Sequence, residues 1–178
     1  MNKSIIILFL TLLSNSVLSV DFISSPTNII FADEINGLYR NILAKEEGIE
    51  RVVYKSKDKN MIFFVFVYKK SMSEGKNTLE VLKNAMKAEK SSHPDIIQSN
   101  ILSKKIKIRG KSLFGKRYIS RNFIYSNRKK ISIKGVYDLS KKYYFEITFI
   151  FTEEYLKLDI DELEKIIKTI LLEFKIKK

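Results

Sequence analysis

Hydrophobic and polar residues alternate along several runs of this chain, most regularly in its second half. Alternation with a period of two is typical of β-strands that are buried on one face. In the clearest run Phe145, Ile147 and Phe149 would point to one side, and Glu146 and Thr148 to the other. The pattern predicts strands over residues 50–55, 61–69, 101–109, 116–125, 130–138 and 142–151.

Three other segments carry apolar residues at helical spacing. The first covers Asp33 to Glu46, and the second begins with Thr78 as its N-cap and reaches about Lys90. The third begins after Asp159, and Glu162 stands three residues later, where a capping box needs an acidic partner. The expected order is therefore helix, two strands, helix, four strands, helix.

Short turns join most of the predicted strands, and such turns connect antiparallel neighbours. We therefore expect an α+β fold, in which helices pack on the faces of a largely antiparallel sheet. No repeat and no Pro- or Gly-rich linker divides the chain, so residues 20–178 are expected to form a single domain.

The element order resembles the PsbP-like superfamily, whose α/β/α sandwich is shared with the Mog-type Ran-binding proteins. The resemblance covers roughly residues 48–174, and four segments carry it: MIFFVFVYKK, NTLEVLKNAMKAE, YYFEITFIFTEEY and LEKIIKTILLEF. It implies a mostly non-enzymatic, accessory role, and many bacterial members are exported. The chain shows no site motif of the family, so the resemblance assigns no residue a role.

The first nineteen residues have the pattern of a secretory signal, with Lys3 before an apolar run and small residues after it. A cut after Ser19 would leave Val17 and Ser19 at the recognised positions. An uncleaved anchor or a buried helix are the alternatives, but the apolar run is far shorter than the ~20 residues that span a bilayer. We expect an exported protein, periplasmic or secreted, that is not integral to the membrane.

Motifs for catalysis, cofactors or metals fail on inspection. The chain has no Cys and a single His, His93, so neither a thiolate site nor a multi-histidine metal site is available. The segment GKSLFGKR (110–117) places Arg117 where a phosphate-binding loop needs Ser or Thr, and a strand follows it. The acidic residues between Asp159 and Glu164 fit helix capping and dipole roles. We predict no enzyme activity, cofactor, metal or bound nucleotide.

Positive charge is concentrated in one stretch, residues 96–137, which holds twelve Lys or Arg and no acidic residue. Without it, residues 20–178 hold 20 basic and 20 acidic residues. If Ile106, Ile108, Ile131 and Ile133 face the core, the lysines beside them point outward and form one positive face or edge of the sheet. The predicted partner-binding residues are Lys105, Lys107, Arg109, Lys111, Lys116, Arg117, Arg121, Arg128, Lys129, Lys130 and Lys134.

Such a surface suits an exported, non-catalytic accessory protein that binds an acidic protein or an anionic envelope surface. Lysines that guard a strand edge against aggregation, or the codon bias of an AT-rich genome, would also account for the charge. The alternative function is a periplasmic immunity protein that neutralises a secreted toxin. We do not expect nucleic acid as the partner, because of export and because no aromatic residues interleave clearly with the charges.

Overall fold

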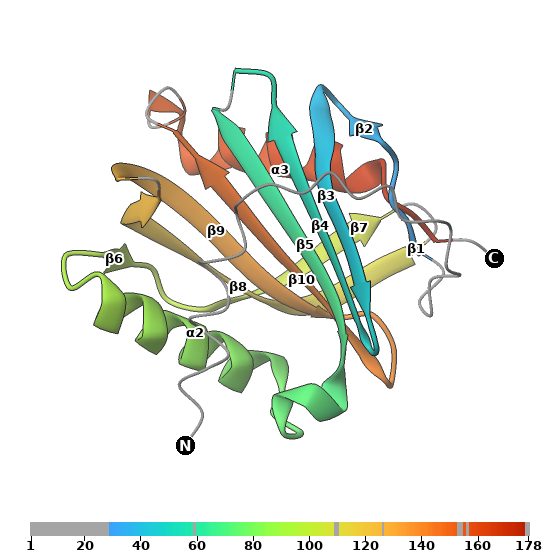
Figure 1. Cartoon of the computed structure of the whole chain (residues 1–178). Helices are drawn as coiled ribbons and strands as arrows, with labels where there is room; N and C mark the ends of the chain where they lie inside the picture. Colours follow the sequence, from blue (N-terminus) through green and yellow to red (C-terminus); the bar gives the residue numbers. More distant parts are fainter. Residues whose placement is uncertain are drawn as a thin grey trace.

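The computed structural model describes residues 29–58, 60–108, 111–125, 127–152, 155 and 157–176. The predicted signal at residues 1–19 lies outside these ranges. Two antiparallel sheets and two α-helices make up the described part (Figure 1). The elements are β1 (Ile29–Ile30), β2 (Glu34–Ile35), β3 (Leu38–Glu46), β4 (Ile49–Ser56), β5 (Met61–Lys69), the 3-10 helix η1 (Lys70–Ser73), α2 (Thr78–Ser92), β6 (Ile97–Gln98), β7 (Leu102–Ile108), β8 (Lys111–Tyr125), β9 (Arg128–Asp138), β10 (Tyr143–Phe151), α3 (Ile160–Leu172) and β11 (Lys175–Ile176).

The larger sheet has nine strands in the order β2-β3-β4-β5-β10-β9-β8-β6, with β7 paired to β8 on the same edge as β6. Every pairing in it is antiparallel. β10 lies at the centre of the order, between β5 and β9. A small second sheet pairs β1 with β11 near the two ends of the described chain. The predicted antiparallel sheet accompanied by helices is confirmed.

The helix predicted over Asp33–Glu46 is wrong, because β2 and β3 form a hairpin there. Asn36 and Gly37 make the turn with φ angles of 47° and 75°. Positive φ at two successive turn residues matches the right-handed twist of a hairpin, and Asn-Gly is the pair that tolerates it best. The helical spacing of the apolar residues that follow was weaker evidence than this turn signal.

Both described helices begin at capping boxes. For α3 the prediction is confirmed: the Asp159 side chain accepts a hydrogen bond from the Glu162 amide, and the Glu162 carboxylate accepts one from the Asp159 amide. For α2 the N-cap is Asn77 and not Thr78, because the Asn77 side chain accepts from the amides of Leu79 and Glu80.

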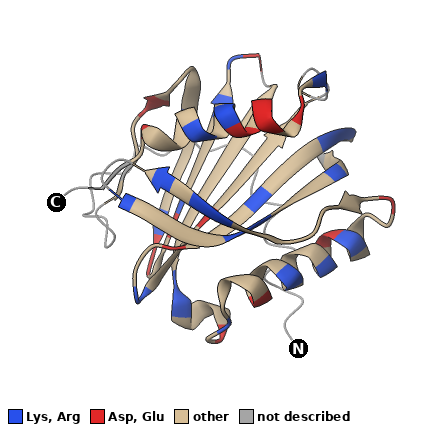
Figure 2. Ribbon diagram, turned by 180° about the vertical axis from the view of Figure 1, so that it is seen from behind, with Lys and Arg blue, Asp and Glu red and all other residues tan. Residues whose placement is uncertain are grey.

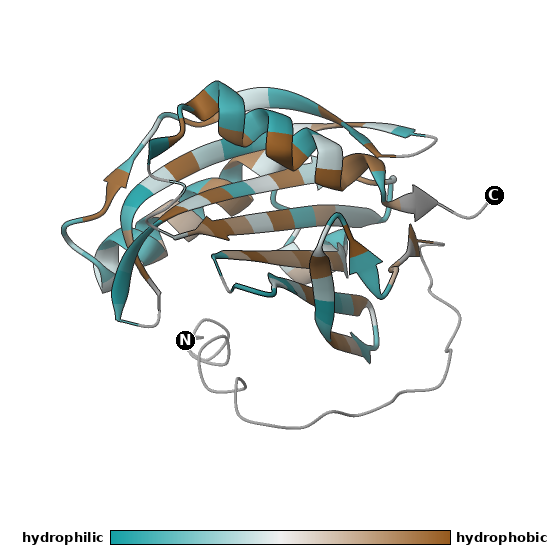
Figure 3. Ribbon diagram, turned by 90° about the horizontal axis from the view of Figure 1, so that it is seen from above, coloured by the Kyte–Doolittle hydropathy of each residue, from teal (hydrophilic) through white to brown (hydrophobic). Residues whose placement is uncertain are grey.

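The two helices pack on different residues of the same strands. Leu82 of α2 is buried with Tyr118, Val136 and Tyr144, whereas α3 packs in a larger cluster that contains Phe145. Neighbouring residues of a strand point to opposite faces of the sheet, so the two clusters lie on opposite faces. Figure 3 shows the corresponding hydrophobic and hydrophilic bands alternating along the strands and along α3.

Aromatic rings fill the centre of the larger cluster. Phe174, which directly follows the last turn of α3, is fully buried. Its ring centroid lies 5.6 Å from that of Phe63 and 6.0–6.2 Å from those of Phe31, Tyr54 and Phe145. These edge-to-face contacts join the C-terminal segment to β4, β5 and β10. The packing of these rings therefore holds the C-terminal segment against the same sheet to which the basic strands belong.

Candidate functional site

The basic stretch of the sequence folds into β6, β7, β8 and most of β9. On β7, Ile106 and Ile108 are buried in the core, and alternation therefore turns Lys105 and Lys107 outward. Both lysines are exposed, as predicted. Arg109 lies outside the described residues. β7 is an edge strand, since β8 is its partner in the described sheet.

An exposed aromatic ring lies among these lysines. Phe114 on β8 is directly opposite Lys105 and has 61% of its surface exposed. The Lys105 ammonium lies 5.2 Å from the centre of the Phe114 ring. Lys116, on the same face of β8, donates to the Ser103 hydroxyl at 2.8 Å. The Phe114 surface is defined as Lys105, Lys107, Phe114 and Lys116.

A second set of exposed cations lies at the other end of β8. Arg121 is beside a bulge in β8, and Arg128 and Lys129 follow the turn into β9. These three residues are defined as the turn group. Tyr125 is the partner of Arg128, and it lies eleven residues after Phe114 on the same strand. In an extended strand this corresponds to about 35 Å. The expected single positive face is therefore two separate groups, which Figure 2 shows along β7 and at the far ends of β8 and β9.

Arg117 does not belong to either group. It is 5% exposed and forms an ion pair with Glu164 of α3, which also pairs with Lys104 at 3.0 Å. Arg117 is in phase with Leu113 and Ile119, so it points to the α3 face of the sheet. Because Arg117 is buried and paired, it does not form part of the exposed basic surface. Glu164, expected to act on the helix dipole, holds this ion-pair network instead.

Lys130 and Lys134 are also not free for a partner. They do point away from Ile131 and Ile133, as predicted, but that face of the sheet is not open solvent. Lys130 is 7% exposed and lies opposite Phe123, whereas the Lys134 ammonium lies 3.3 Å from the carboxylate of Glu89. Because α2 covers part of the face that alternation marked as outward, Lys130 is buried and Lys134 is half-buried in an ion pair, and neither is an exposed cation.

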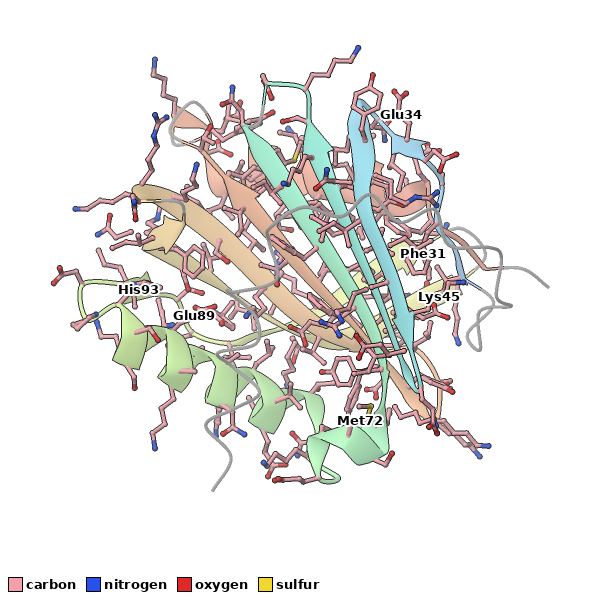
Figure 4. The ribbon with its side chains drawn as sticks, in the orientation of Figure 1. Phe31, Glu34, Lys45, Met72, Glu89 and His93 are labelled. Carbon is pink, nitrogen blue, oxygen red and sulfur yellow. The ribbon has the colours of Figure 1, made fainter. Side chains whose placement is uncertain are left out.

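Glu89 organises a polar cluster between α2 and the sheet that the sequence did not reveal. Its carboxylate accepts hydrogen bonds from Ser120 at 2.9 Å and from Gln98 at 3.2 Å, besides the ion pair with Lys134. Figure 4 shows Glu89 on the side of α2 that faces the strands. These contacts, together with buried Leu82, attach α2 to β6, β8 and β9.

Glu146 of β10 adds a second carboxylate to this cluster. It accepts a hydrogen bond from the Tyr68 hydroxyl at 3.1 Å. Burial raises the pKa of the Glu146 carboxyl, nearby Glu89 raises it further, and Lys134 and Tyr68 offset this only in part. Burial likewise raises the pKa of Tyr118, with Glu89 reinforcing the effect. The available signal was a Glu on a strand in which every other residue except Thr148 is apolar or aromatic.

The remaining candidate residues make contacts within the protein that account for their positions. Lys111 is exposed, and its ammonium donates to the Leu139 carbonyl. His93 is the C-cap of α2, with its ring edge-on to Phe123 at 5.9 Å. Residues 111–117 are part of strand β8, so they form neither a phosphate-binding loop nor the turn between strands that would be the alternative to it. Among the described residues, no group of three or more His, Asp or Glu is placed to hold a metal ion.

Comparisons with known proteins indicate the fold of the chain but do not assign it a function. No protein-family model matches the sequence, and no curated protein matches it. Among solved structures, the chain is similar to cyanobacterial PsbP (CyanoP) from Synechocystis sp. PCC 6803. The TM-score is 0.50 at 12% sequence identity, over 93% of this chain and 99% of that one. The chain therefore has a PsbP-like fold. Within the described ranges, no helix has the length and apolar composition to cross a membrane.

Proposed function

We propose that this is an exported, non-catalytic accessory protein that binds an acidic protein through the exposed cations of β7, β8 and β9. The observation that carries the proposal is the Phe114 surface together with the turn group. Their basic residues form no ion pair with any described carboxylate, and between residues 96 and 137 the sequence offers no acidic residue beside them.

Uncompensated charge of this kind favours an anionic partner. Like charges on neighbouring strands repel one another, and a complementary surface relieves that repulsion and speeds association. Protection of a strand edge accounts for Lys105 and Lys107, which lie on β7. Arg128 and Lys129 stand instead at the tip of the β8–β9 hairpin, beyond the residues that pair with β6 and β10, and they add a second group of exposed cations.

A protein suits this surface better than a lipid bilayer. The exposed cations surround an exposed aromatic ring on one group and stand beside exposed Ile124 on the other. Exposed aromatic residues are enriched at protein interfaces, and charged residues suit the polar rim around them. The signal-like pattern of residues 1–19 supports a partner outside the cytoplasm.

Charge neutralisation with a matched control tests the proposal. In the test variant, glutamine replaces Lys105, Lys107, Arg121, Arg128 and Lys129. In the control, it replaces five exposed lysines of α2, of α3 and of the segment before α3, so that both variants lose equal charge: Lys83, Lys87, Lys157, Lys165 and Lys168.

The measurement is chemical cross-linking in cells, followed by mass spectrometry of the proteins recovered with each variant. We expect the wild type and the control to recover the same acidic protein, and the test variant to lose it. High salt during native recovery should weaken the complex in the same way. Equal recovery by the two variants would show that the basic strands are not the binding surface.

A further inference from the structure

We propose that the Phe114 surface is the docking site for a protein segment that presents an apolar side chain between carboxylates. This inference rests on the proposed function and selects one of the two exposed basic groups. The contact would be centred on Phe114, with the carboxylates held by the lysines around it.

The strand register sets the geometry of this surface. Lys105 is directly opposite Phe114, a position in which Cβ atoms of paired strands lie about 5 Å apart. Lys107 is opposite Ser112, and Lys116 lies two residues beyond Phe114 on the same face. Both are therefore about 7 Å from Phe114 in backbone terms. Three lysines thus stand around one exposed ring in the strand register, and the ammonium of Lys105 lies over it.

This combination defines the chemistry of the occupant. A small anion would neutralise the lysines and leave the Phe114 ring in water. An apolar ligand without charge would cover the ring, but it would leave the nearby lysine ammonium groups without a counter-charge and partly removed from water. A segment that carries both features removes Phe114, 61% exposed, from water and pairs the lysines at the rim of the contact.

The turn group is the competing surface, because Ile124 is 43% exposed and lies opposite Lys129. It is less suited to docking, since Arg128 and Lys129 stand at the tip of a hairpin, whereas Phe114 lies in the part of β8 that pairs with β7, one residue before the pairing with β9 begins. A surface that is already ordered loses less conformational entropy on binding. An aromatic ring is also the better anchor for an interface.

The test uses two short synthetic peptides of alternating glutamate and serine, one with a central leucine and one with a central serine. Affinity of the purified protein for each is measured by fluorescence anisotropy at low salt. The variants are K105Q/K107Q, the charge-matched control R128Q/K129Q, and F114S. Circular dichroism verifies that each variant is folded before binding is measured.

For the leucine peptide, we expect K105Q/K107Q to weaken binding about tenfold and R128Q/K129Q less than about twofold. F114S should weaken the leucine peptide by about threefold to tenfold and leave the serine peptide unchanged, because only leucine contacts the ring. This coupling between Phe114 and leucine would not arise from charge alone.

Three results would overturn the inference, and they separate its failure from that of the proposed function. Loss of binding in R128Q/K129Q but not in K105Q/K107Q would move the site to the turn group and leave the proposed function standing. Equal effects of F114S on both peptides would remove the apolar anchor. Binding to phosphatidylglycerol vesicles with no binding to either peptide would overturn both proposals, because the partner would then be a lipid surface.

Discussion

The ion pair between Arg117 and Glu164 offers a test of whether Arg117 stabilises the fold or binds a partner. Arg117 is 5% exposed, whereas Glu164 is 31% exposed and keeps a second contact to Lys104 at 3.0 Å. The substitution Arg117→Met keeps the buried length of the side chain and leaves Glu164 with Lys104 and water. The substitution Glu164→Leu leaves the buried guanidinium without a carboxylate.

This asymmetry sets the expected magnitudes. Removing one partner of a buried ion pair costs about 3–5 kcal/mol when the other charge stays uncompensated. We therefore expect Glu164→Leu to lower the free energy of unfolding by about 3 kcal/mol, and Arg117→Met by only about 1–2 kcal/mol. The double variant should lose less than the sum of the two, because it removes the buried guanidinium together with its carboxylate and leaves only Lys104, which is 32% exposed, without a partner.

Urea unfolding followed by circular dichroism measures these free energies. The control is Lys116→Gln at the neighbouring position, whose side chain points to the other face of the sheet, and it should change the free energy of unfolding by less than about 0.5 kcal/mol. Additive losses in the double variant would refute the coupling. An unchanged unfolding midpoint in Arg117→Met, together with weakened partner binding, would restore the role that the sequence first indicated for Arg117.

The same pair predicts a dependence on pH. Burial works against the Glu164 carboxylate, but Lys104 and Arg117 outweigh it and hold the pKa of Glu164 below its usual value. A carboxyl with a lowered pKa in the folded state adds stability above its unfolded pKa, and loses it as the pH falls through the folded pKa. The stability difference between wild type and Arg117→Met should therefore shrink in acid.

Three further substitutions test other parts of the fold. Gly135→Ala would place a Cβ 2.6 Å from the buried Tyr137 ring, and we expect a loss of about 1–3 kcal/mol in urea unfolding. Gly37→Ala meets no atom within 4 Å but must adopt a φ of +75°, so it should cost about 1 kcal/mol in the same assay. Because the pKa of Glu146 is raised, its ionisation lowers stability as the pH rises above about 4. Glu146→Gln should therefore raise the melting temperature at pH 7 and not at pH 4.

Alternation predicted most of the sheet correctly, because the strands that carry it are buried on one face. β5, β9 and β10 lie within two or three residues of the predicted bounds. Four two-residue strands, β1, β2, β6 and β11, were beyond its reach, since two residues carry no period. The hairpin at Asn36-Gly37 was missed because helical spacing in the residues after it was given more weight than the turn.

The candidate site was predicted in part. Lys105 and Lys107 are exposed because their strand has one buried face and one free face. The same reasoning failed for Lys134, because the distant helix α2 covers the other face of β9 and brings Glu89 to it. It failed for Arg117 because an arginine in phase with core residues was grouped by charge instead of by phase. Which partner a buried cation meets depends on contacts between distant elements, and sequence alternation holds no information on those.

The most direct test of the central claim, that the basic strands bind an acidic partner, is an NMR titration of the purified protein with the leucine-containing acidic peptide. Backbone amide shifts should be largest along β7 and residues 111–117 of β8, with Phe114 among them, and should disappear at high salt. Shifts that leave β7, β8 and β9 unchanged while other elements respond would contradict the account.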